Sequence, residues 1–183
     1  MTINFLFELL DQKNFADFSK NLREYAKTSP ESFKETNKDG DSLLFVASKL
    51  HPLFVKVCLR EGMSPLDVFG ERDDNALTYC ARDGREDCFR VLADFCRDNS
   101  LHPHTPNGEG STPLMIAACY GNITMCKTIL QFDPDLADLD LDGESVFEQL
   151  NRDTCNNRED IKNLFCNFLV KKNLLGISRN AFL

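Results

Sequence analysis

The chain has 183 residues and a formal net charge of −8, from 21 Lys and Arg against 29 Asp and Glu. This length suits one domain whose core needs no metal or disulfide to fold. The acidic balance disfavours nucleic acid as a partner, because binding to phosphates needs clustered Lys and Arg. No apolar stretch approaches the ~20 residues of a membrane-spanning helix, so we expect no membrane insertion.

The N-terminal segment predicts two helices with an apolar face each. The first is expected within residues 3–10, where most side chains are apolar. The second follows from apolar residues at helical spacing, namely Phe15, Phe18, Leu22 and Tyr25. No basic residue precedes Lys13, which disfavours a signal peptide, so we interpret this segment as part of the fold.

A pattern of residues recurs along the chain with a period near 33. Residues 110–118 read Gly-Ser-Thr-Pro-Leu-Met-Ile-Ala-Ala, and Gly121 follows them. The same apolar pattern occurs at 40–47 and at 74–81, and Gly143 begins a further unit. The interval is 33 residues from Ser42 to Asn75 but 37 from Asn75 to Thr112. We therefore expect about four extra residues in the loop around 99–105.

The run Thr112-Pro113-Leu114, with Ala117-Ala118 and Gly121, resembles the signature of the ankyrin repeat family, although Met115 replaces the family's His. The resemblance covers roughly residues 37–170 and implies an all-α ankyrin solenoid of stacked helix-turn-helix units. The expected division of a single domain (1–175) is an N-terminal cap at 1–36, repeats at 37–69, 70–106 and 107–139, a C-terminal cap at 140–170, and a tail at 171–183.

The residues within each unit favour the same arrangement. Thr112 and Ser42 are suitable N-caps, and Pro113 fits the first turn of a helix, where its missing N–H is not needed. Gly121 is expected to end the inner helix, and Gly62 to end the outer helix of an earlier unit. Neither helix of a pair can bury its apolar face alone, so stacking of units supplies the core.

The eight cysteines include no Cys-x-x-Cys pair, and six of them lie within apolar runs. We interpret them as buried free thiols, which places the protein in a reducing, intracellular and cytoplasmic compartment. Stand-alone ankyrin proteins also occur as effectors that intracellular bacteria deliver into host cells, and the sequence does not separate these origins. No cofactor is expected.

Two segments of the sequence resemble metal sites in part. Cys96, His102 and His104 lie close together in sequence, but zinc needs a fourth ligand that the spacing does not supply. Residues 138–142 read Asp-Leu-Asp-Leu-Asp before Gly143, as in the first half of a calcium loop. Position twelve of that loop is Gln149, which cannot act as the bidentate carboxylate, so calcium is disfavoured.

Catalysis finds little support, because no nucleophile elbow, phosphate-binding glycine loop or paired-histidine metal motif is present. The alternative class is an enzyme or ligand-binding protein that uses Cys119, expected at an exposed helix end, or the loop 96–105. One fast-reacting thiol would favour that alternative over a binding module.

The ankyrin resemblance implies protein–protein recognition through the loop tips and the exposed side of the inner helices. Projected onto this chain, the partner-binding residues are Arg72, Arg82, Tyr120, Glu71, Glu109, Lys49, Asp83 and Arg152. Asp41, Asp74 and Glu144 stand at helix starts, where they complement the helix macrodipole.

Arg72, Arg82 and Tyr120 are the preferred contacts, because Arg and Tyr contribute most at interfaces. We expect their truncation to weaken binding without lowering the melting temperature, whereas Lys56 and Lys127, on the outer helices, serve as controls. The expected role is that of an adaptor or inhibitor of one partner protein, monomeric when free and without catalysis.

Overall fold

The computed structural model describes residues 2–29, 33–67, 73–152 and 157–180, with side chains as far as 151 in the third range and 173 in the fourth. Within these ranges the secondary structure is helical and contains no strand; an isolated bridge joins Thr36 and Ser42. The expected all-α class is therefore confirmed.

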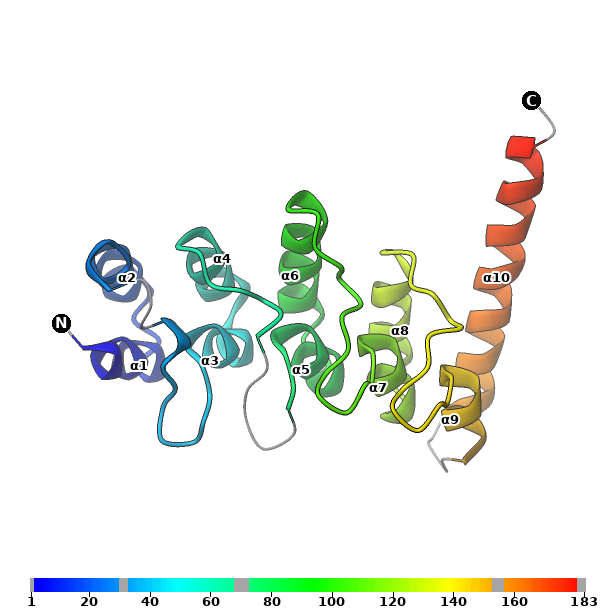
Figure 1. Cartoon of the computed structure of the whole chain (residues 1–183), viewed down its shortest axis with the longest axis horizontal. Helices are drawn as coiled ribbons and strands as arrows, with labels where there is room; N and C mark the ends of the chain where they lie inside the picture. Colours follow the sequence, from blue (N-terminus) through cyan, green and yellow to red (C-terminus); the bar gives the residue numbers. More distant parts are fainter. Residues whose placement is uncertain (1, 30–32, 68–72, 153–156, 181–183) are drawn as a thin grey trace.

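The helices form two rows, each of which runs the length of the molecule (Figure 1). The inner row contains α1 (Ile3–Asp11), α3 (Leu43–Leu50), α5 (Ala76–Asp83), α7 (Pro113–Cys119) and α9 (Val146–Arg152). The outer row contains α2 (Phe15–Thr28), α4 (Pro52–Arg60), α6 (Glu86–Asp98), α8 (Ile123–Leu130) and α10 (Arg158–Asn180). Each helix packs on its neighbours in the same row and on its partner in the other, and the termini lie at opposite ends.

The inner helices begin at the expected caps. The Ser42 hydroxyl accepts from the backbone N–H of Phe45 at 3.2 Å, and the Thr112 hydroxyl accepts from that of Met115 at 3.3 Å. Pro113 occupies the first turn of α7, and Gly121, after the helix end, adopts a positive φ of 68°. These local choices set the length of each inner helix and bring the chain back for the outer one.

The core is continuous along the solenoid, as stacking of units requires. Side chains with no exposure include Leu77, Leu92 and Ile129 in the middle of the chain. Aromatic pairs join successive repeats: the Phe45 and Tyr79 rings lie 4.6 Å apart between α3 and α5, and the Phe18 and Phe54 rings lie 5.4 Å apart between α2 and α4.

Two expectations about lengths are modified by the structure. Helix α6 has 13 residues, against 9 in α4 and 8 in α8, so part of the extra length expected in the loop around 99–105 extends a helix instead. No Gly or Pro interrupts 86–98, which explains why the helix continues. The backbone of α10 likewise runs from Arg158 to Asn180 without a break at the expected start of the tail.

Candidate functional site: the inner-helix and finger surface

Each inner helix is preceded by a loop that we call a finger. Finger 1 spans 37–41, finger 3 spans 107–111 and finger 4 spans 140–144; of the second finger, residues 73 and 74 are described. Below the inner row in Figure 1, these loops line one side of the molecule. They correspond to the loop tips that the sequence assigned to partner binding.

Fingers 1, 3 and 4 share one turn, built around an Asn or Asp side chain. In finger 3 the Asn107 side-chain oxygen accepts from the backbone N–H groups of Glu109 and Ser111, at 3.0 and 2.9 Å. Asn37 does the same in finger 1 and Asp140 in finger 4, each with distances of 2.9 to 3.0 Å. These Asx-type hydrogen bonds hold each tip in a defined shape.

This turn explains the calcium-like spacing at 138–143. One oxygen of the Asp140 carboxylate accepts two backbone N–H groups, and the other accepts from the Gln149 side chain at 2.6 Å. Both carboxylate oxygens thus accept hydrogen bonds from N–H groups. This arrangement stabilises the carboxylate within the turn and does not present it as a ligand to a cation. No group of three potential metal-binding side chains gathers within the described ranges.

Neighbouring fingers are in tight contact. A Cβ built on Gly110 would lie 2.7 Å from the backbone nitrogen of Leu141, and one built on Gly108 would clash with the Asp73 Cβ. The backbone N–H of Gly108 also donates to the Asp73 carbonyl at 2.8 Å. The glycines therefore allow finger 3 to approach fingers 2 and 4 closely.

Acidic residues at the helix starts pair with basic residues at the helix ends of the same unit. The Lys49 ammonium lies 2.5 Å from an Asp41 carboxylate oxygen, and the Arg82 guanidinium forms an ion pair with Asp74. Each pair spans eight positions along the chain. Asp41 and Asp74 thus each have a basic partner in addition to the helix dipole proposed from the sequence.

The Asp74–Arg82 pair is the more buried of the two. The Asp74 side chain is 2% exposed and that of Arg82 is 15% exposed, against 11% for Asp41 and 37% for Lys49. Asp74 also accepts from the Thr78 hydroxyl at 3.1 Å and from the Asn107 side chain at 3.3 Å. Arg82 therefore belongs to a network that connects α5 to finger 3, and its replacement is expected to affect stability as well as binding.

The side chains around these ion pairs also make specific contacts. Lys49 lies over the Phe45 ring, 4.9 Å from its centre. The Tyr79 hydroxyl donates to Asp83 at 2.8 Å, and burial together with this hydrogen bond raises the pKa of Tyr79. Asp83, although exposed, is thus held at the end of α5.

In the repeat of α7, the positions of the ion pair carry Ser111 and Cys119 instead. Cys119 is exposed, as expected, and Tyr120 after it is 54% exposed. Leu141, at the tip of finger 4, is 77% exposed, and Glu109 in finger 3 is exposed too. Among the described residues, exposed apolar side chains therefore occur on this surface at the repeat of α7 and at finger 4, a feature that sequence columns alone did not reveal.

The structure does not describe the side chains of three predicted partner-binding residues. Glu71 and Arg72 lie outside the described residues, and so does the side chain of Arg152. For these the partner-binding role stays a prediction. The controls Lys56 and Lys127 are exposed on α4 and α8, in the outer row.

The alternative zinc ligands have other roles. Cys96 is buried, which raises its pKa to about 11, and the His104 ring nitrogen Nε2 lies 2.8 Å from the Phe132 carbonyl oxygen. Burial lowers the pKa of His104. The loop 99–105 is therefore joined to the next repeat through His104, and neither it nor Cys119 lines the two cavities that border α4 and α6.

Comparisons with known proteins agree with this architecture. The family model for ankyrin repeats in three copies matches residues 43–142, which leaves the exact repeat boundaries as predictions. The crystal structure of EF0377, an ankyrin repeat protein, superposes with a TM-score of 0.72 at 18% identity, over 92% of this chain and 82% of that one. A search of curated proteins gives no match. No helix among the described residues is long and apolar enough to cross a bilayer. Since the matched model spans more than half of the sequence, the chain belongs to the ankyrin repeat family.

Proposed function

We propose that this protein binds a partner protein through its fingers and the exposed ends of its inner helices, and that it acts as an adaptor or inhibitor without a catalytic step. Ankyrin repeats are general protein–protein interaction modules, so the proposal concerns where binding occurs and with what chemistry. The observation that carries it is the exposed Tyr120 ring at the end of α7, adjacent to the helix that carries Arg82.

The surface combines features that favour recognition. Arg82 and Lys49 are held by aspartates, so little side-chain freedom is lost when a partner contacts them. Tyr120 and Leu141 supply apolar area, at 54% and 77% exposure. A partner with an apolar anchor beside acidic groups fits this combination, whereas the net charge of −8 disfavours nucleic acid.

A reducing, intracellular location is part of the proposal. Among the described residues, Cys58, Cys80, Cys88 and Cys96 are buried free thiols. Free thiols persist where glutathione and thioredoxin keep them reduced. The same conditions hold in a host cell that receives a bacterial effector. We further propose that the chain is monomeric when free.

Affinity capture with variants of the intact chain tests the binding surface. Tyr120→Ala is matched with Lys127→Ala, since both side chains are exposed and lie outside the core. A partner recovered with the unchanged chain should lose more than ~1 kcal/mol, about fivefold in Kd, with Tyr120→Ala. Lys127→Ala should retain full affinity, and both variants should melt at the same temperature as the parent chain.

Arg82 needs a different substitution, because Arg82→Ala would remove a partner from the buried Asp74. Arg82→Lys keeps the charge and loses the planar fork that contacts a partner's carboxylate in two places. Loss of binding with Lys127→Ala or Lys56→Ala, combined with full binding by Tyr120→Ala and Arg82→Lys, would refute the proposed surface.

A further inference from the structure

A cavity of about 340 Å³, which we call the outer groove, lies between the outer helices α4 and α6, and these helices stand side by side in Figure 1. Its apolar lining comprises Leu59 from α4, and Val91 and Phe95 from α6. Leu59 is buried, whereas Val91 and Phe95 are half-buried and can contact a ligand. Helix α6 has 13 residues and α4 has 9, so residues 95–98 form an additional turn that lengthens one wall of the groove.

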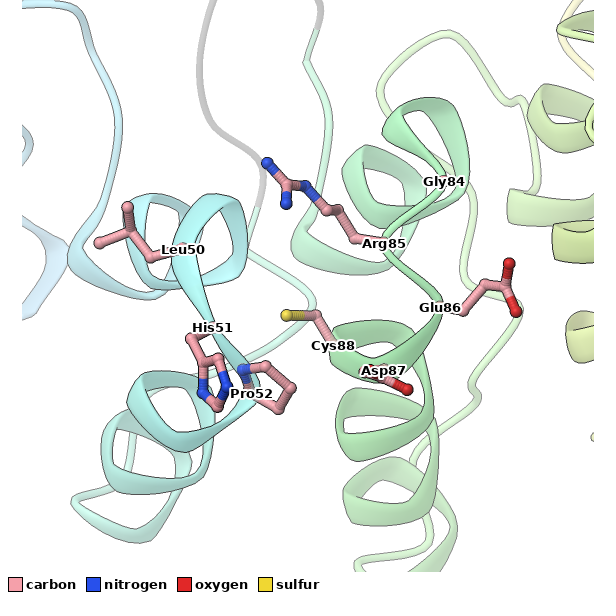
Figure 2. A pocket seen from close by; sticks show the side chains of 8 residues that line it. All are labelled: Leu50, His51, Pro52, Gly84, Arg85, Glu86, Asp87 and Cys88. Carbon is pink, nitrogen blue, oxygen red and sulfur yellow. The ribbon is translucent and has the colours of Figure 1, made fainter. Parts of the chain in front are cut away.

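The two helices that border the outer groove run in the same direction. In Figure 2 the first turns of α4, at Pro52, and of α6, at Cys88, lie on opposite sides of a second cavity of about 470 Å³, and both helices lead away from it. The period of 33 places Lys56 of α4 at the level of position 89 in α6. Asp98 follows nine positions later. Since a helix rises ~1.5 Å per residue, Lys56 and Asp98 stand at opposite ends of the groove, about 13 Å apart along its axis.

Three of the charged side chains that line the outer groove have partners within the chain. Arg90 binds Thr128 and Gln131, Asp94 binds Arg97, and Arg60 binds Glu61. Among the described residues, neither the Lys56 ammonium nor the Asp98 carboxylate makes an ion pair or a side-chain hydrogen bond. Both side chains are exposed, so these two charges are available to a ligand.

The positions of the two free charges define the ligand. Lys56 attracts an acidic group at one end of the groove, and Asp98 attracts a basic group at the other. Asp98 is also the last residue of α6, where the negative end of the helix dipole adds to the attraction for a cation. Val91 and Phe95 lie between these ends and favour an apolar group. A complementary ligand therefore presents acidic, apolar and basic groups in this order over about 13 Å.

An extended peptide meets this requirement with five residues. Alternate side chains of an extended chain face the same side, and at ~3.3 Å per residue the first and fifth positions are about 13 Å apart. A helix of the same length is ~10 Å wide and would fill roughly 1,000 Å³, far more than the outer groove holds. We propose that the outer groove binds an extended segment of a second protein with the pattern acidic-x-apolar-x-basic, whose three side chains contact Lys56, Phe95 and Asp98 in that order.

This site is separate from the partner-binding surface of the fingers, since all of its lining residues belong to the outer helices α4 and α6. The partner bound at the fingers and the segment bound in the outer groove are therefore two different ligands, and failure of either proposal leaves the other standing. Lys56→Ala accordingly remains a control for binding at the fingers, although it should weaken binding in the outer groove.

Nuclear magnetic resonance titration of the intact, isotopically labelled chain tests the site with a defined probe, the blocked peptide Ala-Glu-Ala-Leu-Ala-Lys-Ala. The amide signals of Val91, Phe95 and Asp98 should shift and saturate with a Kd of about 1 mM or lower, while that of Tyr120 stays in place. Peptides with two Glu or two Lys at the charged positions should bind about fivefold more weakly, because each replaces one attraction by a repulsion. Nonspecific attraction to a net charge of −8 would instead favour the peptide with two Lys.

Charge-reversed variants test the two ends of the groove separately. Lys56→Glu should make the peptide with two Lys the tightest of the three, and Asp98→Lys should make the peptide with two Glu the tightest. Lys127→Glu, on the neighbouring outer helix α8, is the matched control and should keep the original order. All three side chains are exposed, so the melting temperature should stay that of the parent chain. No saturable shift at about 5 mM peptide, shifts centred outside the groove, or the same change of preference in Lys127→Glu would overturn the proposal.

Discussion

The ion pairs Asp41–Lys49 and Asp74–Arg82 differ in burial, so removing the basic partner from each tests how burial changes the cost. Arg82→Ala leaves the Asp74 carboxylate, 2% exposed, with donors from Thr78 and Asn107 but without its counter-charge. Removing one partner of a buried pair costs ~3–5 kcal/mol. Because two hydrogen bonds remain, we expect the lower end of that range, about 3 kcal/mol.

Lys49→Ala should cost less. Its side chain is 37% exposed, and an exposed ion pair contributes ~1 kcal/mol at most. The contact of the ammonium with the Phe45 ring adds ~0.5–1 kcal/mol, so the total is about 1–2 kcal/mol. The two variants thus differ by at least about 1 kcal/mol although both delete one positive charge from an inner helix.

Urea unfolding followed by far-ultraviolet circular dichroism measures both losses. The Lys49→Ala effect should shrink with added salt, while the Arg82→Ala effect should change little, since buried pairs are screened less. Adding Asp74→Asn to Arg82→Ala should recover part of the loss, because the uncompensated charge disappears. Equal losses in the two single variants, or a larger loss for Lys49→Ala, would refute the reasoning from burial.

Three further changes test other parts of the structure. Leu114→Ala and Leu44→Ala should each lower the free energy of unfolding by ~2–5 kcal/mol, because both side chains are buried between repeats; near-neutral results would contradict the repeat register. Gly110→Ala should cost more than Gly40→Ala, measured by urea midpoint, because both have positive φ but only the Gly110 Cβ would meet the Leu141 backbone. Burial lowers the pKa of His104, so the unfolded chain binds this proton more readily, and stability should fall as pH decreases below ~6.5. Denaturation midpoints across this range should show a smaller fall for His104→Gln than for the unchanged chain.

The sequence predicted the helix order and the caps, because these depend on local chemistry. Ser42 and Thr112 cap inner helices, and Pro113 occupies a first turn, as their residue types suggested. The period of 33 then placed equivalent residues in columns, and burial of Leu44 and Leu114 follows from that register. Such features need only near neighbours along the chain.

The roles of the charged columns needed three-dimensional information. Asp74 and Arg82 were interpreted separately, one as a partner of the helix dipole and the other as a contact for a partner protein. Their pairing depends on how the two ends of α5 are arranged in space, which the seven intervening residues do not reveal. Cys88 was likewise interpreted as core, because the cavity beside it arises between two repeats.

The tight approach at Gly110 has a mechanical consequence for the solenoid. The backbones of fingers 3 and 4 are already in contact, so the two loops cannot move closer together. A Cβ built on Gly40 in finger 1, in contrast, would meet nothing within 4 Å. Bending that compresses the finger side is therefore resisted where finger 3 meets finger 4. A ligand that contacts both fingers 3 and 4 therefore meets two loops at a fixed spacing.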